Sequence, residues 1–110
     1  MGLDAKPDFQ NEVQLRGFIC KNVIYRKTPL GREIADIIIA VNRNHNKSDY
    51  IPCIAWGENA KKASGLQIGS EIIIEGRLQS RKYMKCIENN LEEMMAFEVS
   101  INKLTEISKN

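Results

Sequence analysis

The chain has 110 residues, 43% of them hydrophobic, and a formal net charge of +2. This length fits one compact domain with a modest core. The absence of an apolar run near the ~18 residues of a membrane span, and of a signal-peptide core in residues 1–10, leads us to expect a cytoplasmic protein. Cys20, Cys53 and Cys86 are widely spaced without a C-x-x-C pair, and His45 is the single histidine, so we expect reduced thiols and no metal site.

The charges are unevenly distributed along the chain. Residues 11–85 carry 13 Lys and Arg against 7 Asp and Glu, whereas the remaining residues carry 3 against 7. The positive charge therefore belongs to the first three-quarters of the domain. Because no amphipathic helix presents these cations, the pattern favours a polyanionic partner over a membrane. A solvated, mildly basic surface is the alternative.

The first ten residues show no periodicity, and we expect them to form a flexible arm. Residues 11–20 then alternate with a period of two, which predicts a half-buried strand. Phe18 falls on the side opposite the core. The residues predicted on the core side are Val13, Leu15, Gly17 and Ile19.

The next segments predict a turn, a buried strand and a polar loop. Residues 25–33 form the turn, in which Pro29 fixes its own φ and Gly31 is free to adopt a positive φ. Residues 34–41 are a nearly continuous β-branched run, so we expect this strand to be covered on both faces. Residues 42–49 predict the polar loop.

The second half of the chain predicts three strands and one helix. Residues 50–56 form a strand in which Pro52 indicates an edge or a bulge. Residues 58–65 form the only plausible helix, with Gly65 in the left-handed position after its end. Strands follow at residues 71–79 and 96–107. Residues 80–95 predict a loop or a hairpin extension, with a helical turn at 88–95 as the alternative.

Five strands with a short helix between the third and the fourth are the layout of the OB-fold. We therefore predict an all-β, five-stranded Greek-key barrel. Its single domain spans residues 11–107, and residues 108–110 form the C-terminal end. Such a barrel leaves one outer face and two loops free to hold a ligand.

The parity of the strands indicates which side chains could cooperate. Tyr50 and Trp56 are six residues apart, so they share one face at a separation of roughly 20 Å. Arg77, Arg81 and Tyr83 share one side, with Gln79, if the fourth strand continues. Rings that alternate with cations suit an extended single strand of nucleic acid, because bases stack and phosphates are negative. For Trp56, a place in the core or at its rim is as well supported as base stacking. For Tyr83, the alternative to base stacking is a structural role.

No combination of residues supports catalysis. His45 has no carboxylate or cysteine partner at triad or ligand spacing, and no glycine-rich phosphate loop is present. The chain also lacks a recognisable pair of a nucleophile and a base. We expect no enzymatic activity and no cofactor.

Several segments occur in a familiar order. "YRKTPLGREIAD", "DYIPCIAWGENA" and "IGSEIIIEGRLQSRKY" follow one another with characteristic spacing. Over residues 11–104 the chain resembles the bacterial single-stranded DNA-binding protein family. The resemblance implies an OB barrel, a homotetramer, and single-stranded DNA wrapped around it in replication, recombination or repair. The corresponding setting is a bacterial cytoplasm, with association to the nucleoid, or a mobile element.

The resemblance also implies particular site residues. The stacking aromatics are Tyr50, Trp56 and Tyr83. The basic positions that it carries over are Arg26, Arg43, Arg81 and Lys82, and we add Lys47 and Arg77 to the expected nucleic-acid contacts. For the oligomer interface we expect Arg16, Phe18 and Cys20 on the outward side of the first strand, which would pair across a two-fold axis into at least a dimer.

Four departures from the family pattern lead to further expectations. Residues 42–49 lack a further stacking aromatic, unless His45 substitutes for it. Pro52 replaces a residue able to donate from its backbone. Residues 86–96 are acidic and rich in Met, so we expect them to repel DNA and to meet a protein instead. The long acidic tail that recruits replication and repair enzymes is missing, which suggests a divergent paralogue or a shortened chain.

These departures keep two other functions open. One is an OB-fold interaction module, similar to primosome accessory proteins, which holds a replication protein and binds DNA or RNA weakly. The other is RNA binding, because stacking barrels do not inherently exclude a 2′-hydroxyl.

Overall fold

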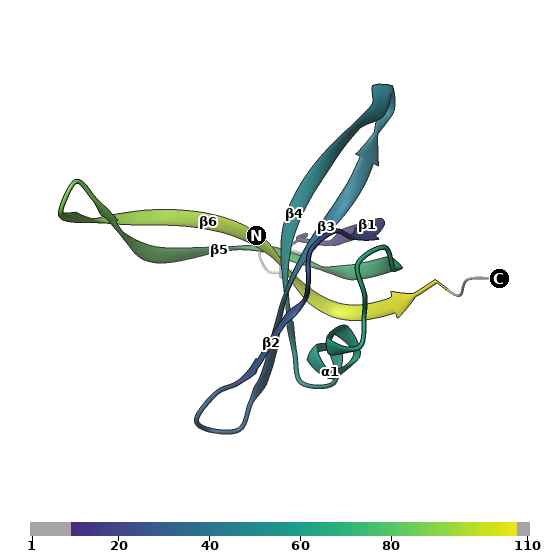
Figure 1. Cartoon of the computed structure of the whole chain (residues 1–110), viewed down its shortest axis with the longest axis horizontal. Coiled ribbons are helices and arrows are strands. Elements are labelled where there is room, and N and C mark those ends of the chain that lie inside the picture. The colour runs from purple at the N-terminus through teal and green to yellow at the C-terminus, as the bar shows by residue number, and fades with distance from the viewer. Residues whose placement is uncertain (1–9, 108–110) are drawn as a thin grey trace, which may run out of the picture.

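The computed structural model describes residues 10–107, which contain six strands, one α-helix and one short 3-10 turn (Figure 1). The N-terminal segment 1–10 that is predicted to be flexible, apart from Gln10, and residues 108–110 lie outside this range. No helix within it is long and apolar enough to cross a bilayer. The elements are β1 (Val13–Ile19), β2 (Ile24–Lys27), β3 (Glu33–Arg43), a 3-10 turn (Asn44–Asn46), β4 (Lys47–Trp56), α1 (Glu58–Ser64), β5 (Glu71–Ile87) and β6 (Asn90–Glu106).

The sheet closes on itself as a barrel. Its strand order is β1-β5-β6-β4-β3-β2, and an additional pairing of β1 with β3 completes the ring. β2 lies outside the ring and extends the edge of β3. All pairings are antiparallel except that of β4 with β6. With α1 between β4 and β5, this arrangement confirms the predicted five-stranded Greek-key OB-fold.

The core follows from the alternation of side chains along the strands. Ile37 and Ile39 of β3 are buried, whereas the alternate residues Ile38 and Ala40 are only half-buried. The expectation that this strand is covered on both faces is therefore wrong for the outer face, which no other layer covers completely. The largest fully buried side chains are Ile19, Ile37, Ile39, Ile72, Ile74, Val99 and Leu104.

The structural features predicted for Gly31 and Pro52 are found, and the one predicted for Gly65 is not. Gly31 has a positive φ of 85°, as predicted, but Gly65 has a φ of −91° and is right-handed. The prediction for Gly65 is wrong because the end of α1 is closed by tight bonds to Lys62 and Ala63, which need no left-handed residue. The edge position of Pro52 is confirmed, since β4 joins β6 only at Cys53 and Ile54.

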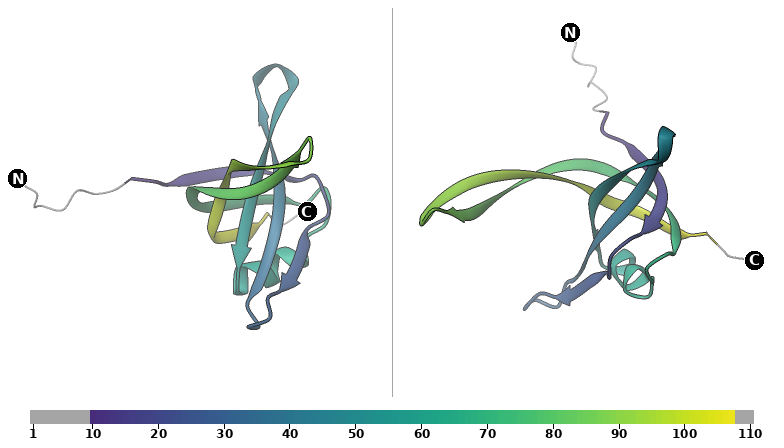
Figure 2. Two further views of the ribbon diagram at one scale, coloured as in Figure 1. Left: turned by 90° about the vertical axis from the view of Figure 1, so that its left-hand side faces the viewer. Right: turned by 45° about the horizontal axis from the view of Figure 1, so that its top comes forward.

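The β5–β6 and β3–β4 hairpins project from the barrel, as Figure 2 shows from two further directions. β5 and β6 continue to a two-residue turn in which Glu88 and Asn89 have φ angles of 50° and 68°, as a type I′ turn requires. We call this projecting part, residues 79–98, the arm. The hairpin extension predicted for residues 80–95 is confirmed, and the helical turn at 88–95 is wrong. The polar loop at 42–49 is shorter than expected, because β3 and β4 extend to a turn with His45 and Asn46 at positive φ.

Two glycines allow strands to approach more closely than a side chain would permit. A Cβ on Gly17 would overlap the carbonyl oxygen of Ala40, and a Cβ on Gly76 would overlap that of Ser100. Gly17 lies where β1 changes partner from β5 to β3. Gly76 lies at the register shift between β5 and β6, where the strands bend. Both glycines are therefore required for barrel closure.

We predict that Gly76→Ala lowers the free energy of unfolding by about 1–3 kcal/mol, because the new methyl group overlaps backbone atoms. Gly65→Ala is the matched control, since its Cβ would meet nothing closer than 3.7 Å and the backbone is right-handed there. We expect Gly65→Ala to be neutral or to stabilise by roughly 0.4–1 kcal/mol. Urea unfolding followed by circular dichroism measures both. Equal stability of Gly76→Ala and the unaltered chain would contradict the steric constraint.

Candidate nucleic-acid interface

Tyr50 and Trp56 lie on the outer face of the β2-β3-β4 sheet. The register places Tyr50 opposite Ala40, which is in turn opposite Phe18, and aligns Trp56 with Ile34 and then with Arg26. Tyr50 is 67% exposed and Trp56 37%. The regular strand confirms the parity prediction that both rings project from one face. Tyr50 therefore offers the most open aromatic surface in this sheet.

Trp56 has a neighbour that sequence reasoning missed. The guanidinium carbon of Arg32 lies 4.9 Å from the centroid of the indole ring, which is a cation–π contact. Arg32 comes from the turn between β2 and β3, so a pattern within one strand gives no signal for this contact. One side of the indole is thus covered by a cation, which limits how a base can stack on this ring.

Arg26 and Tyr25 lie on opposite faces of β2. Arg26 is on the outer face with Trp56 and forms an ion pair with Asp36, with 3.5 Å between Nη2 and Oδ2. Tyr25 donates a short hydrogen bond to the carboxylate of Glu33. This bond, supported by partial desolvation and by the charge of Glu33, raises the pKa of Tyr25. The phenol of Tyr25 is therefore protonated and held by its own chain.

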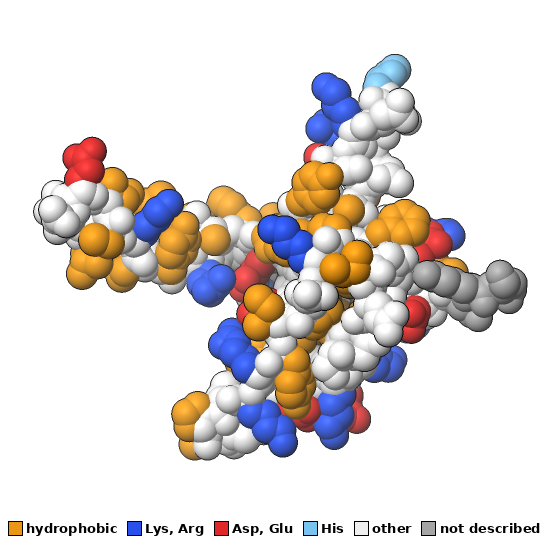
Figure 3. All heavy atoms as spheres, viewed as in Figure 1, with side chains coloured by type: hydrophobic (Ala, Val, Ile, Leu, Met, Phe, Trp, Pro, Cys, Tyr) orange, Lys and Arg blue, Asp and Glu red, His pale blue; other side chains and the backbone are white. Residues whose placement is uncertain are grey.

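The tip of the β3–β4 hairpin is cationic. Arg43, Asn44, His45 and Lys47 line a hollow there, and Figure 3 shows Lys and Arg side chains next to the histidine at this tip. Arg43 forms an ion pair with Asp49, with 3.1 Å between Nε and Oδ1. The two predicted basic residues, Arg43 and Lys47, are thus brought together.

The cations of β5 fall on the two faces of this strand. Because β5 runs to Ile87, Arg77, Arg81 and Tyr83 share one side, as predicted for a continuing strand. Tyr83 is 39% exposed and lies opposite Met94. Lys82 points to the other side, so it does not share a face with Arg81 and Tyr83. The strand passes through these residues.

Most of the predicted cations already have an acidic partner. Arg81 Nε lies 3.5 Å from Glu98, a buried carboxylate that also accepts a 2.8 Å hydrogen bond from Gln79. Lys82 lies 3.4 Å from Glu93. Of the six basic residues predicted to contact nucleic acid, four are thus in ion pairs. Within residues 10–107 no ion pair involves the other two, Lys47 and Arg77.

The arm also has an apolar face that sequence reasoning did not recognise as exposed. Its members share the parity of the core residues Ile74 and Val99, but they lie beyond the end of the barrel. Phe97, 58% exposed, adds an aromatic that parity alone assigns to the core. Figure 3 shows hydrophobic side chains along the arm. We call this set the apolar stripe: Leu78, Met84, Leu91, Met95 and Phe97.

The residues predicted at an oligomer interface lie near the outer side of β1. Phe18 is 37% exposed, and Arg16 is held by Glu71 through a 2.8 Å bond. Cys20 follows the end of β1, and its thiol contacts the carbonyl of Ile38. Among the described residues, β1 pairs with β3 only at Phe18 and Ile19, so its earlier part has one open edge.

Nucleophilic and ligand-holding groups elsewhere do not form a reactive site. Burial raises the pKa of Cys53 to about 12, with a smaller contribution from the charge of Glu98, so Cys53 is a thiol at neutral pH. No cluster of His, Cys, Asp and Glu within residues 10–107 could hold a metal ion.

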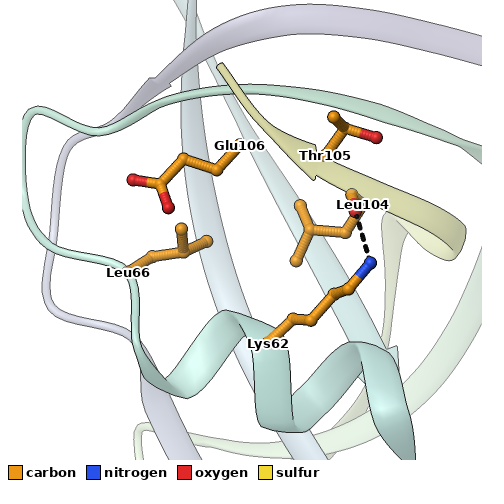
Figure 4. Close-up of a pocket in the computed structure, with 5 residues that line it drawn as sticks. All are labelled: Lys62, Leu66, Leu104, Thr105 and Glu106. Carbon is orange, nitrogen blue, oxygen red and sulfur yellow. Dashed lines mark hydrogen bonds between the residues drawn. The ribbon is translucent and has the colours of Figure 1, made fainter. Parts of the chain in front are cut away.

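A cavity of about 260 Å³ lies between α1 and the end of β6 (Figure 4). It is lined by Lys62, Leu66, Leu104, Thr105 and Glu106. The ammonium group of Lys62 donates to the carbonyl of Leu104, at 3.2 Å, and does not pair with Glu106. The cavity therefore holds no converging acid and base.

The closed barrel with exposed rings and cations on its outer strands is that of an OB-fold protein. Residues 10–106 match the model of the single-strand binding protein family. The chain belongs to this family, which confirms the resemblance.

Several relatives support this membership. The chain is 35% identical over 80 residues to single-stranded DNA-binding protein 2 of Listeria innocua, covering 66% of this chain and 50% of that one. It is 36% identical over 80 residues to single-stranded DNA-binding protein A of Bacillus subtilis, covering 66% and 46%. The chain thus spans about half the length of these relatives.

The fold is also found in solved structures. The single-stranded DNA-binding protein of Thermus aquaticus matches with a TM-score of 0.75 at 24% identity, over 92% of this chain and 42% of that one. A deletion mutant of that protein matches with a TM-score of 0.78 at 23% identity, over 98% and 46%.

Proposed function

We propose that this protein binds single-stranded DNA without sequence specificity, in replication, recombination or repair, and that it has no enzymatic activity. The observation that carries this proposal is the exposure of Tyr50, Trp56 and Tyr83 on outer strands that also present cations. Family membership supports it, because the relatives are named for this activity. A bacterial cytoplasm, with the nucleoid, is the setting that we infer.

The mechanism combines stacking with phosphate contacts. Each ring that stacks on a base contributes about 1–3 kcal/mol irrespective of the base. Tyr50 is the strongest candidate because it is the most exposed of the three, whereas Trp56 is less exposed and has Arg32 over one side of its ring. Lys47 and Arg77 can bind phosphates without first leaving an acid, and Arg26, Arg43, Arg81 and Lys82 complete the proposed contacts. Tyr83 extends the path onto the arm.

We predict that oligo(dT) quenches the fluorescence of Trp56, the single tryptophan. Tyr50→Ala is expected to weaken binding by about 1–3 kcal/mol, because one stacking surface is lost. Tyr25→Ala is the matched control: Tyr25 lies on the opposite face of β2 and is held by Glu33, so its removal should leave affinity within about twofold. Titrations over a salt series measure both variants. If oligo(dT) does not quench Trp56 at low salt, and the chain does not shift oligo(dT) in a gel, the proposal is overturned. Tighter binding of oligo(U) than of oligo(dT) would reassign the function to RNA binding.

We also propose that the chain is a homo-oligomer, at least a dimer and a tetramer by family resemblance. The open edge of β1 presents unpaired backbone groups beside the exposed ring of Phe18. Pairing of two β1 strands across a two-fold axis would satisfy those groups and cover the ring. Arg16 lies in this part of β1 and is bonded to Glu71 of β5, and Cys20 follows the end of β1 beside β3.

Light scattering is therefore expected to give at least twice the chain mass of 12.5 kDa. We predict that Phe18→Asp lowers this mass, because a carboxylate would be buried at the two-fold contact. Ile68→Asp introduces the same charge at another exposed apolar residue, away from β1, and should leave the mass unchanged. A monomeric unaltered chain, or equal masses for both variants, would contradict the interface.

A second candidate function is an OB-fold interaction module whose main role is to bind a replication protein. The apolar stripe favours it, because five large hydrophobic side chains are exposed on one face of the β5–β6 hairpin. The acidic residues Glu88, Glu92 and Glu93 near the arm tip also disfavour phosphate contacts there.

The two candidates predict opposite phenotypes for two variants. If protein binding dominates, Leu91→Ser with Met95→Ser abolishes co-purification of a replication protein and leaves oligo(dT) affinity within about twofold, since the stripe supplies apolar area. Tyr50→Ala then has the reverse effect. Quantitative co-purification and fluorescence titration measure the two activities. If the arm variant loses DNA affinity instead, the stripe belongs to the nucleic-acid path.

A further inference from the structure

The four ion pairs on the predicted binding surfaces all join diagonal neighbours on adjacent antiparallel strands. Each cation contacts an acid that is two residues away from its direct partner. Arg43 is opposite Lys47 and pairs with Asp49, and Arg26 is opposite Ile34 and pairs with Asp36. Arg81 reaches Glu98 along the same diagonal, whereas Lys82 reaches Glu93 in the other direction along β6. Long side chains reach such diagonal neighbours, so the strand register itself fixes these pairs.

Three of the four acids are free to release their cation. Asp36, Asp49 and Glu93 have side chains that are 43%, 46% and 56% exposed, so water can solvate each carboxylate once it is left alone. Glu98 differs because its side chain is only 7% exposed, and loss of Arg81 would leave a buried charge with Gln79 as its donor. Arg81 touches Glu98 through Nε, which leaves its terminal nitrogens for a phosphate.

We infer that Asp36, Asp49 and Glu93 are internal competitors of the nucleic-acid backbone, which set its affinity and salt dependence by occupying Arg26, Arg43 and Lys82. This inference rests on the proposed function. A phosphate that takes one of these cations must displace the carboxylate. Exposed ion pairs are weak, so displacement is inexpensive, but it lowers the gain from every such contact.

The inference has a distinctive thermodynamic consequence. Single-stranded nucleic acid releases counterions when cations neutralise its phosphates, which gives a log–log salt slope of about 0.7 per phosphate. A displaced carboxylate takes up a counterion from solution and offsets part of that release. The slope of the unaltered chain is therefore shallower than its six predicted cations suggest, and removal of an acid steepens it.

The test is fluorescence titration with oligo(dT) over a salt series. Asp49→Asn is expected to tighten binding about two- to fivefold at low salt, to steepen the salt slope, and to approach the unaltered chain at high salt. The combined variant D36N/D49N/E93Q should gain roughly the product of the single effects, because the three pairs lie on separate strand pairs. Urea unfolding verifies that these exposed substitutions leave the fold intact.

A double-mutant cycle separates competition from a general change of charge. In the Arg43→Gln background, Asp49→Asn should no longer tighten binding or change the slope, because the cation that Asp49 occupies is gone. The control variant E58Q/E75Q/E106Q removes the same charge from acids that do not pair with the predicted cations, and it should change affinity by less than about twofold.

Each outcome decides between the possibilities. An equal gain for the control variant, or persistence of the Asp49→Asn effect without Arg43, would overturn the competition and leave only a field effect. An unchanged affinity and slope for Asp49→Asn would also overturn it, while the binding of oligo(dT) itself upholds the proposed function. If neither the unaltered chain nor any variant binds, the proposed function fails first.

Discussion

Barrel closure depends on two places where backbones meet without a side chain between them. Gly17 allows β1 to pass from β5 to β3 against the carbonyl of Ala40, and Gly76 allows β5 to bend over Ser100. A closed barrel removes most of the free strand edges that an open sheet of this length would expose. The inward-facing apolar residues of the five barrel strands then share one small core, and exposed side chains on the outer face, such as Tyr50, are available for binding.

Closure also explains why the two projecting hairpins differ from the barrel. Their side chains still alternate between two faces, but beyond the barrel the face that continues the inward side no longer meets a core. On the arm this leaves Leu91 and Met95 exposed on the face that buries Val99 nearer the barrel. A two-stranded ribbon has little stability by itself, so such a face favours contact with another molecule. The same geometry carries Tyr83 outward on the opposite face.

Features set by the periodicity and order of segments could largely be predicted from the sequence, whereas side-chain contacts between segments could not. The helix at 58–64 and the shared face of Tyr50 and Trp56 follow from local periodicity. The contact of Arg32 with Trp56 joins a turn to a strand end, and no single-strand pattern reports it. The conformation of Gly65 was missed because a glycine after a helix permits a left-handed turn without requiring one.

Contacts between strands also decide how stacking and charge share the proposed affinity for nucleic acid. A surplus of six positive charges over residues 11–85 suggests a strongly electrostatic surface when it is counted along the sequence. The register pairs four of the six predicted cations with acids, so much of that surplus acts as local dipoles. Tyr50 has no such competitor, because a ring in water needs no partner to be displaced before a base stacks on it. Stacking therefore has to supply a larger share of the affinity than the count of cations implies.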